Sequence, residues 1–317
     1  MREQLLQLDS MRIHFSTVGM QVVNIVLAFV MFGVALGIQP SMFRKVLRHP
    51  KSVLVGLMSQ LVALPAVTFL LVTLLHRQLT PMVAMGMLLV ASCPGGNISN
   101  FMSQLSRANV ELSITLTAFT TSLATLLTPA NFALWGGLYV NCVTSEAGIA
   151  LRDLHIDVWQ MFETVFILLG IPLVLGMLTV HFLPRIAERL KKPMQYFSIT
   201  FFVLIVVLAF SKNFQIFVHS IDYIFFIVLI HNALALCIGF GLSTLFHLPT
   251  ADRRTLTIET GIQNSGLGLV LLFNPKIFPP DLAIGGMLFV AAWWAVWHII
   301  SGLTLSFIFA HHHTQTA

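Results

Sequence analysis

Two long apolar stretches of this sequence are each interrupted, deep inside, by helix-breaking and polar residues. The first interruption, residues 93–100, reads Cys-Pro-Gly-Gly-Asn-Ile-Ser-Asn, and the second, residues 258–266, reads Ile-Glu-Thr-Gly-Ile-Gln-Asn-Ser-Gly. Because an unpaired backbone group is costly in hydrocarbon, unwound backbone at membrane depth is expected only where protein encloses it or where it lines a polar cavity. Two such breaks in corresponding positions of two halves indicate the binding site of a secondary transporter.

Glu259, in the second interruption, is the only acidic residue well inside an apolar stretch. A carboxylate at the centre of a membrane helix costs about 2.5–3.5 kcal/mol on insertion scales, so it needs a cationic or hydrogen-bonding partner. No Lys or Arg lies at comparable depth, and a bound cation is therefore the expected partner. The neighbouring Asn, Gln, Ser and Thr side chains and the freed carbonyls are oxygen ligands, which suit alkali or alkaline-earth ions rather than soft transition metals.

Ser113, Thr117 and Thr120 are spaced so that a helix places their hydroxyls on one face. Such hydroxyls commonly bond to carbonyls of their own helix in membrane proteins. Beside two broken helices and an unpaired Glu259, we favour the interpretation that they are cation ligands. His231 and His298 also lie in apolar stretches, and substrate contact, proton transfer and structural hydrogen bonding all remain open for them.

The composition is that of an integral membrane protein. Of 317 residues, 57% are hydrophobic and only 9% are charged, against roughly 25% charged in a soluble domain. The net charge of +5 does not predict nucleic-acid binding, because the basic residues lie in short loops between apolar runs. The three cysteines are far apart and predict neither a disulfide framework nor a metal cluster.

Apolar runs of about 20 residues predict an all-α fold of about nine transmembrane helices in one domain, residues 1–317. The predicted spans are 17–38, 53–75, 82–105, 112–138, 158–182, 197–211, 221–246, 255–274 and 283–309. Helices one to four and six to nine each contain a broken helix followed by a helix that carries hydroxyl groups. The single fifth helix between them makes the two halves inverted repeats, an arrangement that many secondary transporters share.

Lys and Arg residues in the loops predict the orientation. One set of loops holds Arg44, Lys45, Arg48, Lys51, Arg107, Arg185, Arg189, Lys191, Lys192, Arg253 and Arg254. The opposite set holds Arg2, Arg12, Arg77, Arg152, Lys212 and Lys276. The richer side is expected to be cytoplasmic, because basic residues resist translocation. The amino terminus is then outside and the carboxyl terminus inside the cell inner (plasma) membrane.

The break motifs, together with His231-Asn232 and the stretch from Trp297-His298 to Ser301-Gly302, resemble the bile acid:sodium symporter family. The similarity covers about 250 residues, from the region of Met31 to the ninth helix. The resemblance implies a core domain that contains two crossing broken helices, approximately residues 50–138 and 221–310. It also implies a panel domain, approximately residues 14–49 and 155–215.

The family binds two sodium ions behind the substrate, and the resemblance transfers both sites to this chain. One would consist of Ser99, Asn100, Ser113, Thr117 and Glu259. The other would consist of Gln60, Glu259, Gln263 and the backbone carbonyls of Thr260 and Ile262. Two departures from the family pattern are Asn97-Ile98, where a small pair is usual, and Thr260, where an aliphatic residue is common.

The predicted function is therefore sodium-coupled import of an organic anion by alternating access, with the lipid bilayer as the surroundings and no enzymatic activity. A bile acid or similar amphipathic anion is the preferred substrate, and a small carboxylate such as pantoate is the alternative. An intramembrane enzyme is a further alternative, and the oligomeric state is left open. The expected substrate contacts are Asn97, Asn264, Asn274, Trp294 and His298.

Overall fold

The computed structural model describes residues 2–10, 17–38, 50–143, 158–212, 214–274, 277–279 and 282–312. Regular structure in these ranges is helical, apart from one isolated antiparallel bridge. Several basic residues used to predict the orientation, Arg12, Arg44, Lys45, Arg48, Arg152 and Lys276, lie outside the described residues. So do residues 39–49 of the expected panel and most of the connection between the fourth and fifth helices.

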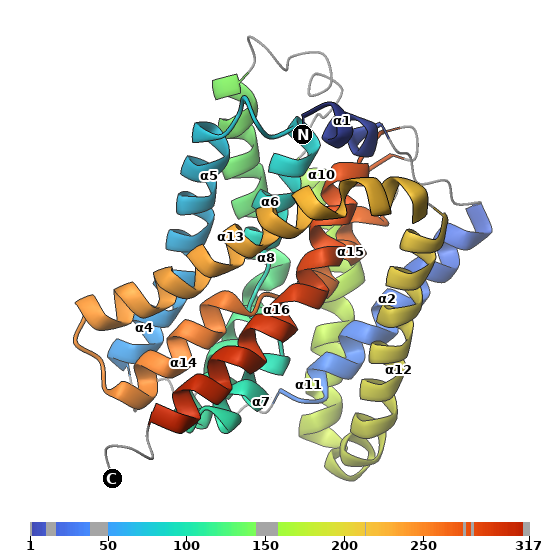
Figure 1. Cartoon of the computed structure of the whole chain (residues 1–317). Helices are drawn as coiled ribbons and strands as arrows, with labels where there is room; N and C mark the ends of the chain where they lie inside the picture. Colours follow the sequence, from blue (N-terminus) through green and yellow to red (C-terminus); the bar gives the residue numbers. More distant parts are fainter. Residues whose placement is uncertain are drawn as a thin grey trace.

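After a short amino-terminal helix, the described residues form nine helical segments (Figure 1). In the first half they are α1 (Arg2–Asp9), α2 (Thr17–Ala35), α4 (Pro50–Met58), η1 (Ser59–Ala63), α5 (Leu64–Leu74), α6 (Pro81–Ser92), α7 (Ile98–Leu105) and α8 (Val110–Val143). In the second half they are α10 (Val158–Val165), η2 (Phe166–Gly170), α11 (Ile171–Phe182), α12 (Pro184–Lys212), α13 (Phe214–Leu245), α14 (Thr250–Gly261), α15 (Ser265–Leu272) and α16 (Gly285–His312). In this count α4–η1–α5, α10–η2–α11 and the two broken helices, α6 with α7 and α14 with α15, are each one segment. The third and eighth predicted spans are each split in two, at the two polar interruptions.

Some helices are longer than the apolar runs that predicted them. The sixth span was expected at 197–211, but α12 begins at Pro184, and α13 begins at Phe214 rather than at residue 221. The added first turns of α12 are rich in Arg, Glu, Leu and Lys, which favour a helix although they lower hydropathy. Hydropathy therefore located the spans and missed their polar ends.

Four described helical stretches are long and apolar enough to cross a membrane on their own: Pro50–Leu74, Val110–Val143, Ile221–Leu245 and Gly285–His311. The shorter α6 and α11 are apolar as well. Large apolar side chains on the outside, such as Leu54, Leu70 and Leu74, are more than half exposed. An apolar exterior of this extent is expected of a protein that contacts lipid.

Two wide π-helical turns, η1 and η2, each precede a proline at the second residue of the next helix, Pro65 and Pro172. Proline has no N–H, so the carbonyl four residues before it loses its usual helical donor. Around η1 the Leu64 N–H instead reaches back five residues to Ser59, and Asn131 of α8 donates to the freed Leu61 carbonyl at 3.0 Å. The proline thus widens the turn that carries Ser59 and Gln60.

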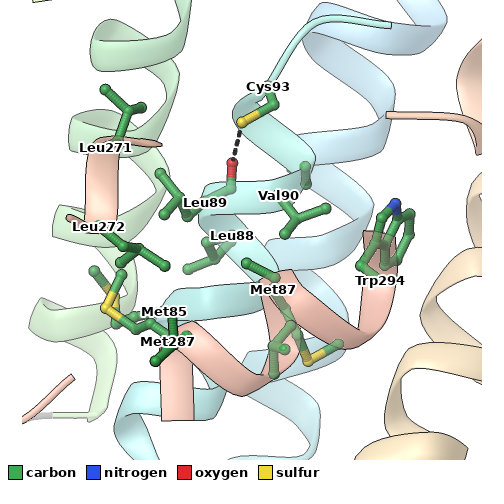
Figure 2. Close-up of a cluster of buried hydrophobic side chains, with 14 of the residues drawn as sticks. Met85, Met87, Leu88, Leu89, Val90, Cys93, Leu271, Leu272, Met287 and Trp294 are labelled. Atoms are coloured by element: carbon green, nitrogen blue, oxygen red, sulfur yellow. Dashed lines mark hydrogen bonds between the residues drawn. The ribbon is translucent and has the colours of Figure 1, made fainter. Parts of the chain in front are cut away.

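The half-helix α6 is enclosed by protein: every residue from Pro81 to Ser92 is buried. A helix that is apolar on all sides is expected to be enclosed in this way. Figure 2 shows its Met85, Met87, Leu88 and Leu89 side chains facing α15 and α16. Gly86 permits close contact with α16, because a Cβ there would lie 2.7 Å from the Cα of Met287. The first broken helix is therefore held rigidly inside the bundle.

A second set of helices packs together on one side of the bundle in Figure 1: α2 lies against α11 and α12. Small residues allow the close approach of α2 and α11, since a Cβ on Gly176 would collide with Ala35. This set meets the helices around α6 mainly where α10 and η2 contact α8. Both broken helices lie outside this set.

A candidate cation site at the crossing of two broken helices

The two unwound segments pair with each other through their backbones. Gly95 and Gln263 form the isolated antiparallel bridge. The Gly96 N–H donates to the Ile262 carbonyl at 2.7 Å, and the Asn264 N–H donates to the Pro94 carbonyl at 2.7 Å. These bonds satisfy backbone groups that the helix breaks would otherwise leave unpaired in a buried place. The sequence-based prediction of two breaks that meet is confirmed at the level of the backbone.

The glycines of the first break are required by space. A Cβ on Gly95 would lie 2.9 Å from Oε2 of Glu259 and 3.1 Å from Oε1 of Gln60. A Cβ on Gly96 would lie 3.2 Å from the Gln263 carbonyl oxygen. The same measurement places the oxygens of Glu259 and Gln60 close to one backbone position.

Glu259, at the end of α14, is fully buried and surrounded by hydroxyl groups from the first half of the chain. Ser99 of α7 donates a short hydrogen bond to its Oε1. From α8, Ser113 donates at 2.5 Å and Thr117 lies 3.1 Å from each carboxylate oxygen. Ser113 also lies 2.9 Å from Oδ1 of Asn100. The five residues expected at the first sodium site therefore lie together around one carboxylate.

Of the residues expected at the second sodium site, Gln60 has its amide oxygen near the same carboxylate, and Gln263 lies on the second break. Gln60, on η1, is fully buried, and neither end of its amide has a hydrogen-bond partner of normal geometry among the described residues. Gln263 donates through Nε2 to the Thr260 carbonyl at 2.8 Å, while its Oε1 has no partner in the described part of the chain. Two buried amide oxygens at the crossing thus have no hydrogen-bond partner among the described residues.

This donor set fits a hard monovalent or divalent cation. The hydrogen-bond partners of Glu259 are neutral hydroxyls, and a buried carboxylate without a counter-charge is costly. Carboxylate, amide, hydroxyl and carbonyl oxygens are the ligands that such cations take in proteins. Within the described ranges no group of three or more His, Cys, Asp or Glu could hold a transition metal.

Thr120 belongs to the helix rather than to the site. Its hydroxyl bonds to the Leu116 carbonyl of its own helix at 2.9 Å. Of the three hydroxyls, those of Ser113 and Thr117 point to Glu259, where a cation ligand is expected. That of Thr120 bonds to its own helix.

The expected substrate contacts are not all at the crossing. Asn97, which precedes α7, is exposed, and Asn264, which precedes α15, is half-buried and accepts from the Leu267 N–H at 3.1 Å. Asn274, Trp294 and His298 are buried, at 1%, 0% and 6% exposure. Figure 2 shows Trp294 within the apolar cluster around α6. Only the two asparagines at the breaks are at all open to a ligand in this structure.

Several residues hold the crossing through contacts that the sequence did not predict. Asn232 of α13 donates to the Gly261 carbonyl at 2.7 Å and accepts from Ser301 of α16 at 2.6 Å, so it stabilises the second break. His231 bonds to Thr68 of α5 at 2.8 Å. These contacts favour structural roles among those left open for the His231-Asn232 pair. Ser59, which bonds to Thr260, gave no signal beyond its place beside Gln60.

A buried aspartate that the sequence did not single out lies at the amino end of each of α6 and α14. Asp9 of α1 accepts from the Thr80 hydroxyl at 2.9 Å and from the Met82 N–H at 3.1 Å. Burial outweighs these bonds and raises the pKa of Asp9 from 3.8 to about 7. Asp252, in the first turn of α14, accepts from Ser52 at 2.6 Å and from Asn109 at 2.8 Å. The two broken helices are therefore anchored at their outer ends as well as at the crossing.

Comparison of the sequence with known proteins identifies its family. A model of the Sodium Bile acid symporter family matches residues 24–220. The chain is 29% identical over 284 residues to the "uncharacterized sodium-dependent transporter YocS" of Bacillus subtilis, covering 90% of this chain and 81% of that protein.

Two eukaryotic relatives are longer than this chain. Identity is 30% over 266 residues with human "sodium/bile acid cotransporter 4", covering 84% of this chain and 58% of the relative. It is 26% over 277 residues with the "probable sodium/metabolite cotransporter BASS2, chloroplastic" of Oryza sativa subsp. japonica, covering 84% and 62%. The chain thus spans less than two thirds of the length of these two relatives. Since the family model covers more than half of the chain, this protein belongs to the sodium bile acid symporter family, a family of multi-pass membrane transporters.

Proposed function

We propose that this chain is a sodium-coupled symporter that imports an organic anion by alternating access. The observation that carries the proposal is the buried Glu259 carboxylate, whose hydrogen-bond partners are neutral hydroxyls from the other half of the chain. A sodium ion at this point neutralises the carboxylate and gives the free amide oxygens a partner. The names of the relatives, each a sodium-dependent transporter or sodium cotransporter, support sodium as the cation. Members of the family are transporters rather than enzymes, so the intramembrane-enzyme alternative is set aside.

Two sodium ions are proposed, with Glu259 shared between them. The first ion takes its other ligands from Ser99, Asn100, Ser113 and Thr117. The second takes them from Gln60, Gln263 and the carbonyls of Thr260 and Ile262. Both carbonyls already accept one hydrogen bond, from Gln263 and Gly96 respectively. A carbonyl oxygen has two lone pairs, so each of them retains one for an ion.

Transport is proposed to move one set of helices against the other. The set α2, α10–η2–α11 and α12 corresponds to the expected panel, and the helices around the crossing correspond to the core. Because contact between the sets is concentrated at α10, η2 and α8, their relative movement would change packing mainly there. Sodium binding neutralises the Glu259 carboxylate at the crossing. This lowers the free-energy barrier to moving the core together with the bound anion.

The anion is proposed to bind where α7 and α15 begin at the crossing. The amino ends of helices carry partial positive charge and unpaired N–H groups, which favour a carboxylate or sulfonate. Asn97 and Asn264 lie at these two positions. A bile acid or similar amphipathic anion remains our first candidate, and one relative's name includes bile acid. A small carboxylate such as pantoate is the second candidate. The burial of Asn274 and Trp294 supports it, because Asn97 and Asn264 are then the expected contacts that a ligand can reach.

The test is uptake into sealed proteoliposomes under an inward sodium gradient, with taurocholate and pantoate measured side by side. A tenfold gradient supplies about 2.8 kcal/mol for two ions. A membrane potential of 100 mV adds about 2.3 kcal/mol for one net positive charge. Together these would sustain roughly several-thousand-fold accumulation of a monovalent anion, and uptake would carry current. Unchanged uptake of the transported anion after replacement of sodium by choline would sink the mechanism.

The topology belongs to the same proposal: nine membrane crossings in the inner (plasma) membrane, with the amino terminus outside and the carboxyl terminus in the cytoplasm. The remaining evidence is the distribution of Lys and Arg along the sequence. Reporter groups near the two termini should be labelled from opposite sides of the membrane. Labelling of both from the same side would refute an odd number of crossings.

A further inference from the structure

The side chains of Ser59 and Thr260 form a buried hydroxyl pair between η1 and the end of α14. Their oxygens lie 2.6 Å apart, and both residues are 0% exposed. Ser59 Oγ is also 3.1 Å from the Gly56 carbonyl of α4. Each hydroxyl has a single proton, so both bonds form when Ser59 donates to Gly56 and Thr260 donates to Ser59. This pair joins one helix of the first half to the broken helix of the second.

Both members of the pair adjoin residues proposed to hold the second sodium ion. Ser59 directly precedes Gln60, and Thr260 directly follows Glu259. The Thr260 carbonyl fixes the Gln263 side chain through its Nε2 at 2.8 Å. The hydroxyl pair is thus linked through the backbone to Gln60 and Gln263, whose amide oxygens have no hydrogen-bond partner among the described residues.

The surroundings hold the pair in place from both sides. On the far side of Thr260, a Cβ on Gly239 of α13 would lie 2.9 Å from the Thr260 hydroxyl oxygen and 2.9 Å from the Cα of Thr257. There is thus little room for Thr260 to turn away from Ser59. On the near side, Asn131 holds the wide turn of η1 through the Leu61 carbonyl.

We propose that the Ser59–Thr260 hydroxyl pair is a positioning element for the second sodium ion. It fixes the π turn against the end of α14 and thereby presents the oxygens of Gln60 and Gln263 together beside Glu259. The hydroxyls act through these neighbours and are not themselves ligands. The inference rests on the proposed sodium-coupled function and adds side-chain roles to two residues for which that function requires none.

The test titrates purified full-length protein with sodium alone, by calorimetry, in choline-balanced buffer. Thr260→Val removes the hydroxyl at nearly constant volume. Loss of one neutral hydrogen bond should raise the half-saturating sodium concentration about fivefold and lower the Hill coefficient towards one, because only the second ion is affected. Ser59→Ala removes the same bond and also its own bond to the Gly56 carbonyl, so its effect should be at least as large. The double variant should be no worse than Ser59→Ala alone, since the Ser59–Thr260 bond can be lost only once. Thr260→Ser, which restores the hydroxyl, should return the sodium response towards that of the natural protein.

Thr257→Val is the matched control. Thr257 lies on the same helix and is equally buried, but its hydroxyl bonds to the Arg253 carbonyl of its own helix at 2.7 Å. If Thr260→Val changes sodium binding no more than Thr257→Val, or if the effects of Ser59→Ala and Thr260→Val add, the positioning role is wrong. Absence of sodium binding by the natural protein would instead overturn the proposed function. Melting temperatures in choline show whether any variant has lost its fold.

Discussion

Glu259→Gln is the substitution that separates most clearly the proposed sodium sites from a purely structural role of the crossing. Gln has nearly the same volume as Glu and keeps one oxygen to accept from Ser99, Ser113 or Thr117. The natural carboxylate is fully buried with neutral hydroxyl partners. Removing an uncompensated buried charge should leave folding intact, and in the absence of sodium the variant should be at least as stable as the natural protein.

The effect on sodium binding follows from the geometry of the hydroxyl ring. Hydroxyl oxygens lie 2.5–3.1 Å from the carboxylate, so an ion among them would be within roughly 4 Å of its charge. At an effective dielectric constant of about 20, that attraction is worth about 4 kcal/mol. Its loss corresponds to roughly thousandfold weaker sodium binding.

The assay is the melting temperature of the purified protein as sodium replaces choline. At a sodium concentration of about 100 times the dissociation constant, one bound ion stabilises the natural protein by about 2.7 kcal/mol. At the same concentration the variant should gain less than about 0.1 kcal/mol, which no melting curve detects. Glu163→Gln, at an exposed position on α10, is the control and should keep the full sodium response. A normal sodium-induced shift in Glu259→Gln would refute the reasoning.

Three further predictions follow. Ser113→Ala should raise the sodium concentration for half-maximal uptake about tenfold, because it removes an oxygen ligand and loss of a polar contact with a charged group costs about 1.5–3 kcal/mol. Ser122→Ala, whose hydroxyl bonds to its own helix, should change little, and equal effects of the two substitutions would contradict the site. Gly95→Ala should abolish sodium-stimulated uptake without loss of expression, because its Cβ would lie 2.9 Å from Glu259 Oε2 and displace the carboxylate. Normal uptake would show that the crossing can accommodate a methyl group. Because the pKa of Asp9 is raised to about 7, the docked helix α1 favours the protonated carboxyl. Docking should be strongest below about pH 4 and weaken as pH rises to about 7, by up to about 4 kcal/mol, with little further change above that. Hydrogen exchange of α1, corrected for intrinsic rates, should show this change and should lose it in Asp9→Asn.

The sequence by itself determined the features that depend on neighbouring residues. A Pro-Gly-Gly run breaks the third span, and glycines among polar residues interrupt the eighth, so the division of both spans could be predicted from local sequence. Glu259 has no basic residue at its depth, so the sequence also predicted that its carboxylate needs a bound cation or hydrogen-bond donors as partners. The resemblance to a family then named the residues that the structure brings around this carboxylate, Ser99, Asn100, Ser113 and Thr117.

Only the tertiary structure decided which distant groups meet and which side chains are enclosed. Ser59 and Thr260 are separated by 201 positions in the chain, and no local pattern marks them as a pair. Trp294 and Asn274 have types that suit a ligand pocket, yet Trp294 is enclosed in the apolar cluster around α6 and Asn274 is buried as well. Hydropathy did not predict the polar first turns of α12, because polar residues extend the helix beyond the apolar run that hydropathy detects. In each case the outcome depends on how helices pack across the two halves, and packing is a property of the assembled surfaces rather than of any single segment.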